Sequence, residues 1–159
     1  ITSQILERLG QIQEQNPEKL IIADSRRGLQ SYPNLTYKMN ANELAAWKGC
    51  SKMSLDQVKN ESFQMARKSG QPVFVSMADQ GITGVVPKGD QAYAASLPLR
   101  GPIDIVGAGD SVTANLCASL AAEASLDEAL QLSMRAASCV IHQLGTTGTA
   151  TRRDLLQFA

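Results

Sequence analysis

The sequence predicts an α/β protein with a layered sheet flanked by helices. Two observations lead to this prediction: short apolar runs with the length of buried strands, and longer segments with helical spacing that begin at capping sequences. Strand-like and helix-like segments are mixed along the chain, as expected for one layered domain. In sheets of this class, ligands bind beyond the carboxyl ends of the strands, so a functional site is expected there.

Five strands are expected before residue 95, and the first carries a charged residue at its end. The apolar run Leu20–Ala23 predicts a buried strand with Asp24 at its carboxyl edge. The Asp24 carboxylate either contacts a ribose or pairs with Arg26 or Arg27 in solvent. The other strands are expected at residues 35–39, 73–77, 82–86 and 91–94.

Five helices are expected, in part because capping sequences mark where they begin. Gln57 and Glu128 each follow a serine by three residues, which is the spacing of a capping box. The first expected helix is the opening segment with Ile5, Leu9 and Ile12, and the second runs from Ser54 to Lys68 and is stopped by Gly70. A third begins at Asp110, and a last helix at 152–158 is capped by Thr151. Between these two, a helix begins at Ser125 and is ended by Gly145, and its apolar face carries Leu126, Leu130, Met134, Ala137 and Ile141.

The composition excludes several classes of function. Fifteen basic residues balance fifteen acidic ones, so the net charge indicates neither a nucleic-acid partner nor an anionic membrane partner. Cys50, Cys117 and Cys139 lie far apart without a CxxC pair, which indicates neither a zinc site nor a disulfide framework. No apolar run approaches the roughly 18 residues of a membrane span. We expect a cytoplasmic protein with small-molecule ligands, and a homo-oligomer stays open.

The most informative segment is DIVGAGDS at residues 104–111, where small residues lie between a short predicted strand and a strong predicted helix. Backbone N–H groups at a helix start lack intrahelical partners, and the helix dipole is positive there. Gly107, Ala108 and Gly109 therefore predict an anion hole for a phosphate group. Asp110 is the candidate base, because a carboxylate beside that phosphate can accept a hydroxyl proton. The alternative is a plain strand-to-helix turn with Asp110 as its N-cap.

Residues 104–150 resemble the second signature of the PfkB (ribokinase-like) carbohydrate kinases, in which Asp-Thr-x-Gly-Ala-Gly-Asp leads into an alanine-rich helix. Two shorter landmarks occur in the expected order: Asn40-Ala-Asn-Glu43 matches Asn-x-x-Glu, and residues 76–81 resemble Thr-x-Gly-x-x-Gly. The segment IHQLGTTGTA and residues 24–27 look most like the kinase domain of heptose-phosphate kinase/adenylyltransferase proteins.

This resemblance implies a three-layer ribokinase-like fold, of which residues 1–159 are the C-terminal, nucleotide-binding portion. Since the chain opens with Ile1 inside a predicted helix, we expect an N-terminal sugar-binding and lid part to be absent, and the fragment alone to be inactive. The implied reaction is ATP-dependent phosphoryl transfer to a sugar or sugar-phosphate hydroxyl, with heptose 7-phosphate as the subgroup's candidate substrate. The implied cofactors are ATP and Mg²⁺.

The resemblance also implies roles for single residues, each with a structural alternative. Asn40 and Glu43 organise magnesium through water, or else they cap a helix that begins near Asn42. Asp104 is expected to satisfy backbone groups, and His142 to pack or to line an adenine pocket. The residues assigned to the nucleotide are Ser76, Asp79 and Gly81, which also fit ordinary hairpin punctuation, and Met134, Ala137 and Ile141.

Three residues depart from the family pattern: Ile105 replaces a threonine, Ala78 a glycine, and Met134 an asparagine that often approaches the adenine. They support a rival prediction, a nucleotide-binding module or degenerate kinase that keeps the fold without turnover.

Overall fold

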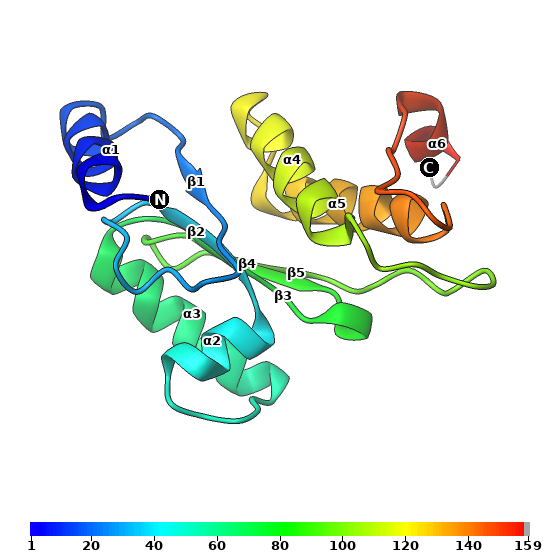
Figure 1. Cartoon of the computed structure of the whole chain (residues 1–159), viewed down its shortest axis with the longest axis horizontal. Coiled ribbons are helices and arrows are strands. Elements are labelled where there is room, and N and C mark those ends of the chain that lie inside the picture. The colour runs from blue at the N-terminus through cyan, green and yellow to red at the C-terminus, as the bar shows by residue number, and fades with distance from the viewer. Residues whose placement is uncertain (158–159) are drawn as a thin grey trace. The chain divides into compact units, whose positions relative to one another are not determined.

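The computed structural model of the protein describes residues 1–157. Its elements in chain order are α1 (Ser3–Gln15), β1 (Ile22–Ala23), β2 (Thr36–Asn40), α2 (Ala41–Trp47), α3 (Leu55–Ser69), β3 (Val73–Ser76), the 3₁₀ turn η1 (Ala78–Gln80), β4 (Ile82–Val85), β5 (Gln91–Ala94), α4 (Ala108–Ala121), α5 (Leu126–Ile141) and α6 (Arg152–Leu156). The five strands make one sheet in the order β1-β2-β3-β4-β5 (Figure 1). Helices and strands are mixed along the chain as the sequence predicts, which confirms the α/β class.

The chain divides into two compact units, Ile1–Val75 with Gly84–Gln91, and Ser76–Thr83 with Ala92–Ala159. The first unit holds α1, α2 and α3, and β1 runs parallel to β2 with Ile22 opposite Thr36. Figure 1 shows α1 on one side of these two strands and the pair α2 and α3 on the other. The largest fully buried side chains of this unit are Leu29, Leu35, Leu44, Val58, Val73, Phe74, Val75 and Val85.

Helix α3 begins and ends where its sequence directs. The Ser54 hydroxyl accepts the N–H of Gln57, and the Gln57 side chain accepts the N–H of Ser54, so both halves of the predicted capping box are formed. Gly70 ends the helix in the left-handed conformation at φ +69°, which glycine adopts without steric cost.

The second unit is built on α4 and α5, which pack against each other, and α6 packs against α5. Val112 and Leu116 are buried on α4, at the i, i+4 spacing that places two side chains on one helix face. Helix α5 carries the complete capping box of Ser125 and Glu128, and burial on this helix extends almost continuously from Ala129 to Val140. Both helices therefore present small and apolar residues to one shared core.

Several expected boundaries are wrong. The predicted strand before Gly107 is not formed, because residues 102–105 carry no strand pairing and the side chains of Ile105 and Val106 are exposed. Helix α5 ends at Ile141 rather than at Gly145. The last helix is formed to Leu156 with Thr151 as its cap, while Phe158 of the expected range lies outside the described residues.

Within residues 1–157, the helices are all too short or too polar to cross a membrane. Cys50 is exposed, Cys117 is half-buried and Cys139 is buried, and all three are free thiols.

Candidate functional site

The segment that leads into α4 places the two main candidate groups next to each other. Gly107 is the N-cap at φ +82°, Ala108 is the first helical residue, and Asp110 lies in the first turn. Asp110 is exposed and does not cap the helix, so the alternative of an aspartate N-cap is wrong. The positive end of α4 and an exposed carboxylate are thus side by side, an arrangement that can bind an anion and accept a proton.

Gly107 is required by a close backbone contact that the sequence did not reveal. A Cβ atom at this position would lie 2.1 Å from the carbonyl oxygen of Thr147, and the backbone is already in the left-handed region. Only glycine satisfies both conditions without displacing the loop after α5. The repeated small residues of Gly145–Thr149 were the one sequence signal for this contact.

The start of α4 is open to solvent, although N–H groups at this end already donate hydrogen bonds. Gly109 and Asp110 are exposed. The N–H of Ala108 donates to the Ile105 carbonyl at 3.2 Å, and the N–H of Ser111 donates to the Gly107 carbonyl at 2.9 Å. An anion at this end would therefore compete with the Ile105 carbonyl for the Ala108 N–H.

Asp104 fixes the segment that precedes α4, which forms no strand. One carboxylate oxygen accepts the N–H of Val106 at 3.0 Å, and the other accepts the N–H of Gly145 at 3.2 Å. Its own N–H donates to the Ile141 carbonyl at 2.8 Å. The structure thus gives Asp104 the backbone role expected for it, and that role ties the entry to α4 to the end of α5.

Two side chains beyond α5 hold the same region. His142 Nδ1 lies 2.7 Å from the Ser138 carbonyl, and Nε2 accepts the N–H of Arg100 at 2.9 Å. The Gln143 amide donates to the Thr149 carbonyl at 2.7 Å and accepts the Thr149 N–H at 3.0 Å. His142 therefore packs and forms hydrogen bonds as a structural residue. Gln143 holds the loop next to Gly107 closed, a role that the sequence did not reveal.

The second candidate segment is the turn after β3, whose predicted residues differ in exposure. Ser76 is half-buried at the strand end, Asp79 is exposed in η1, and Gly81 is buried. A Cβ atom at Gly81 would lie 2.1 Å from the Ala94 carbonyl oxygen, and its φ is +96°. Ala78 adopts φ +49°, a left-handed conformation that glycine, the residue expected here from the resembling motif, adopts without steric cost.

The three residues of α5 that were assigned to the nucleotide are only partly accessible to solvent. Met134 and Ala137 are each 8% exposed, so both side chains belong to the packed face of the helix. Ile141, at the last turn, is half-buried. The role of these three residues toward a nucleotide stays a prediction.

Asn40 and Glu43 form the helix cap that the sequence offered as the alternative to a magnesium role. The Asn40 side chain accepts the Glu43 N–H at 2.9 Å, and the Glu43 carboxylate accepts the Asn40 N–H at 2.7 Å, at the start of α2. An ionised carboxylate has about four lone-pair sites, so the cap leaves Glu43 able to accept further bonds. Across residues 1–157, no group of three or more His, Cys, Asp or Glu residues is arranged to hold a metal ion.

Asp24 has a partner that the sequence did not indicate. Its carboxylate lies 2.9 Å from the Lys38 ammonium, whose side chain is only 6% exposed. Lys38 lies on β2, next to β1 in the sheet, and parallel pairing brings the two residues together. The pair satisfies a buried cation, while a contact of Asp24 with a ribose or with Arg26 or Arg27 stays a prediction.

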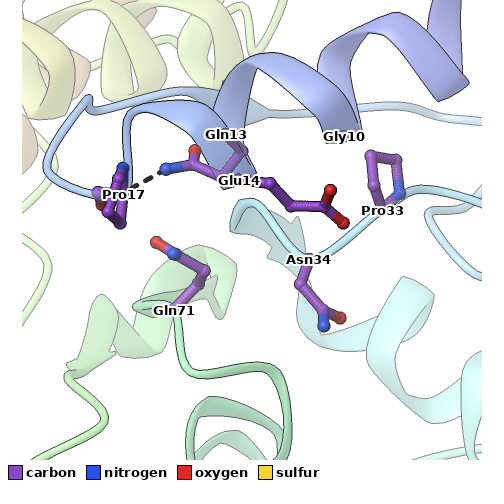
Figure 2. Close-up of a pocket in the computed structure, with 7 residues that line it drawn as sticks. All are labelled: Gly10, Gln13, Glu14, Pro17, Pro33, Asn34 and Gln71. Atoms are coloured by element: carbon purple, nitrogen blue, oxygen red, sulfur yellow. Dashed lines mark hydrogen bonds between the residues drawn. The ribbon is translucent and has the colours of Figure 1, made fainter.

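A cavity of about 220 Å³ opens in the first unit, where α1 meets the loops before β2 and β3 (Figure 2). Gln13 is 5% exposed, and its amide nitrogen donates to the carbonyls of Asn16, Pro17 and Lys19, which closes the turn after α1. The cavity shares no residue with the predicted site, and its lining consists of Gly10, Gln13, Glu14, Pro17, Pro33, Asn34 and Gln71.

The layered fold and the open, glycine-rich start of α4 are typical of α/β proteins that bind phosphate groups at helix N-termini. The model of the pfkB family carbohydrate kinases matches residues 3–152, and the chain belongs to this family. The bifunctional protein HldE of Bradyrhizobium sp. (strain ORS 278) is 34% identical over 90 residues, which are 55% of this chain and 18% of that protein.

Solved structures agree with the family and confirm the ribokinase-like fold. Phosphofructokinase-2 from Escherichia coli, in complex with substrates and products, aligns with a TM-score of 0.78 and 26% identity over 96% of this chain and 51% of that chain. Arabidopsis thaliana ribokinase, complexed with ribose and ATP, aligns with a TM-score of 0.70 and 22% identity over 81% of this chain and 41% of that chain. The chain thus spans about half the length of these kinases and less than a quarter of HldE.

Proposed function

We propose that the chain is the nucleotide-binding and catalytic part of an ATP-dependent sugar kinase, which transfers a phosphoryl group to a hydroxyl of a sugar or sugar phosphate. The observation that carries the proposal is the open positive end of α4, with the Asp110 carboxylate exposed in its first turn. Phosphoryl transfer requires little covalent chemistry from the protein. It requires that the reacting groups are positioned and that the charge on the transferring phosphoryl group is compensated, and the positive end of α4 and the Asp110 carboxylate suit these tasks.

In the proposed mechanism, Asp110 accepts the proton of the sugar hydroxyl as its oxygen forms the new bond to the γ-phosphorus and the bond to the ADP oxygen breaks. The N–H groups of Ala108, Gly109 and Asp110 stabilise the charge on the transferring group. For Ala108 this requires exchanging its bond to the Ile105 carbonyl for one to the phosphate. The close contact between Gly107 and Thr147 holds the turn rigid, so the donors keep their direction.

The nucleotide side of the site is proposed on the turn after β3 and on α5. Ser76 ends the buried strand β3, and Asp79 and Gly81 follow it, which is the place where α/β sheets bind ligands. The Arabidopsis ribokinase to which the chain is similar was solved with ATP, which supports ATP as the donor. The α5 residues proposed to contact the base are Met134, Ala137 and Ile141.

Bound magnesium would neutralise phosphate charge, and Asn40 and Glu43 would orient its water ligands rather than coordinate it directly. Their capping bonds hold both side chains at the start of α2, which supports an orienting role. For the sugar, we propose heptose 7-phosphate as the first candidate, on the similarity to HldE and the matching IHQLGTTGTA segment. The sugar-binding and lid residues are proposed to lie outside these 159 residues, since the kinases aligned above are about twice as long.

The test is Asp110→Asn in the full-length protein that contains this chain. We expect turnover with sugar phosphates to fall by more than about 1000-fold, and the ATP dissociation constant to stay within about threefold, because the amide keeps the shape and loses the basic oxygen. Asp56→Asn is the matched control, since Asp56 is also an exposed acidic residue in the first turn of a helix, α3. Full activity of the Asp110 variant would exclude the proposed role.

A second candidate is a nucleotide-binding module without turnover. Two observations favour it: the Ala108 N–H is already bonded to the Ile105 carbonyl, and Ala78 is held in a left-handed conformation. Calorimetry with ATP and Mg²⁺, followed by a transfer assay with heptose 7-phosphate and common sugars, separates the two functions. Binding without transfer would support the module.

A further inference from the structure

The turn Ala78–Gln80 is held from one side by the segment that follows it in the sheet. Within the turn, the Met77 N–H donates to the Gly81 carbonyl at 2.7 Å, and the Gln80 N–H donates to the Met77 carbonyl at 2.9 Å. These bonds close the turn, but they do not explain why Ala78 stays at φ +49°. An L-residue pays roughly 1 to 2 kcal/mol in that region, so the surroundings must stabilise it.

The stabilising contacts come from two hydroxyl groups in residues 92–96. The Tyr93 hydroxyl donates to the Gln80 carbonyl at 2.5 Å. The Ser96 hydroxyl donates to the carbonyl of Asp79, the next residue back along the turn. Two successive carbonyls of the turn are thus fixed by side chains from a single neighbouring segment.

The backbone of the same segment also lies close to the residues that follow the turn. Gly81 lies so close to β5 that a Cβ atom would meet the Ala94 carbonyl at 2.1 Å. The buried Thr83 hydroxyl donates to the Ala92 carbonyl at 3.1 Å and ties β4 to the start of the same segment. Residues 92–96 therefore bond to the turn at Asp79 and Gln80 and lie against the residues that follow it.

We infer that Tyr93 and Ser96 are positioning residues, which hold the Ala78–Gln80 turn in the orientation that receives the nucleotide. The inference rests on the proposed function for the nucleotide, while the restraint on the turn stands on the contacts above. Both hydroxyls act through the backbone of Asp79 and Gln80. Their effect falls on the affinity for ATP rather than on proton transfer at Asp110.

The test uses Tyr93→Phe, Ser96→Ala and the double variant, each of which deletes hydroxyls and keeps the remaining side chain. Tyr32→Phe is the matched control, because this half-buried tyrosine belongs to the first unit. Ser96→Thr keeps the hydroxyl and is the rescue variant. The measurements are amide hydrogen exchange of residues 77–81 without nucleotide, the ATP dissociation constant by calorimetry, and KM and kcat in the full-length protein.

We expect the Gln80 and Gly81 amides to exchange about threefold faster in each single variant and about tenfold faster in the double variant. The ATP dissociation constant and the KM for ATP should rise in the same order, by no more than these factors, because the affinity falls in proportion to the fraction of molecules whose turn is competent. The kcat value should change by less than about twofold, and Ser96→Thr and Tyr32→Phe should resemble the unaltered protein.

Each other outcome overturns a defined part of the inference. Unchanged amide exchange in the double variant would show that the hydroxyls do not hold the turn. Faster exchange with an unchanged ATP dissociation constant would show that the restraint has no role in nucleotide binding. If the unaltered protein binds no ATP, the proposed function fails together with the nucleotide role, while the exchange data still decide whether the hydroxyls restrain the turn.

Discussion

Gly107→Ala tests the contact that shapes the start of α4, and its effect can be separated into two parts. The first part is backbone strain, since φ is +82° and an L-residue in that region costs about 1 to 2 kcal/mol. Alanine also restricts the unfolded chain, which offsets about 0.4 to 1 kcal/mol of this cost. The net effect of the backbone alone is therefore a loss of about 0.5 to 1 kcal/mol.

The second part is the overlap of the new methyl group with the Thr147 carbonyl. A separation of 2.1 Å is far below van der Waals contact, so the loop after α5 must move by about 1 Å. That movement strains the bond from Gly145 to Asp104 and the pair of bonds between Gln143 and Thr149. Such bonds contribute about 1 kcal/mol each, and their partial loss adds about 2 kcal/mol to the cost of the backbone, so we expect a total destabilisation of about 3 kcal/mol.

Gly145→Ala is the matched control, because Gly145 lies in the same unit at φ +72° and a Cβ atom there would meet nothing within 4 Å. Urea unfolding measures the free energy of unfolding of both variants. Gly145→Ala should lose about 0.5 to 1 kcal/mol, and Gly107→Ala about 2 kcal/mol more. Equal losses in the two variants would refute the reasoning, since they would show that the Thr147 carbonyl exerts no steric constraint.

Three further predictions concern single residues. Ala78→Gly should stabilise the protein by about 0.5 to 1 kcal/mol by removing left-handed strain, and a loss of stability in urea unfolding would contradict this. Asp24→Asn should cost about 2 kcal/mol, because it leaves the buried Lys38 ammonium without its carboxylate; a cost below about 0.5 kcal/mol would show that the pair is dispensable. Hydrogen bonds from the Ser125 side chain and backbone hold the pKa of Glu128 below its usual value of 4.5, so the cap stabilises the fold above that pH and is lost as the pH falls through the lowered pKa. Ser125→Ala should therefore raise the Glu128 pKa in an NMR titration, and an unchanged pKa would exclude the side-chain hydrogen bond as its cause.

The comparison of sequence and structure shows which interactions each could predict. The helix starts at Ser54 and Ser125 were predicted correctly, because a capping box joins residues only three positions apart. The open, glycine-rich start of α4 was also anticipated, although the strand expected before it is absent. That strand was wrong because apolar residues such as Ile105 and Val106 fit a buried strand by type, while the structure leaves both exposed.

By itself the sequence determined the α/β class, the capped helices and the family, because these follow from local spacing and from a long contiguous match. Only the tertiary structure decided that Asp104 bonds to Gly145, 41 residues away, and that Lys38 pairs with Asp24 across two strands. It likewise decided that Gly107 must be glycine, since the constraint comes from the Thr147 carbonyl. Partners so far apart along the chain meet only when the sheet and helices have packed, so no local pattern records them.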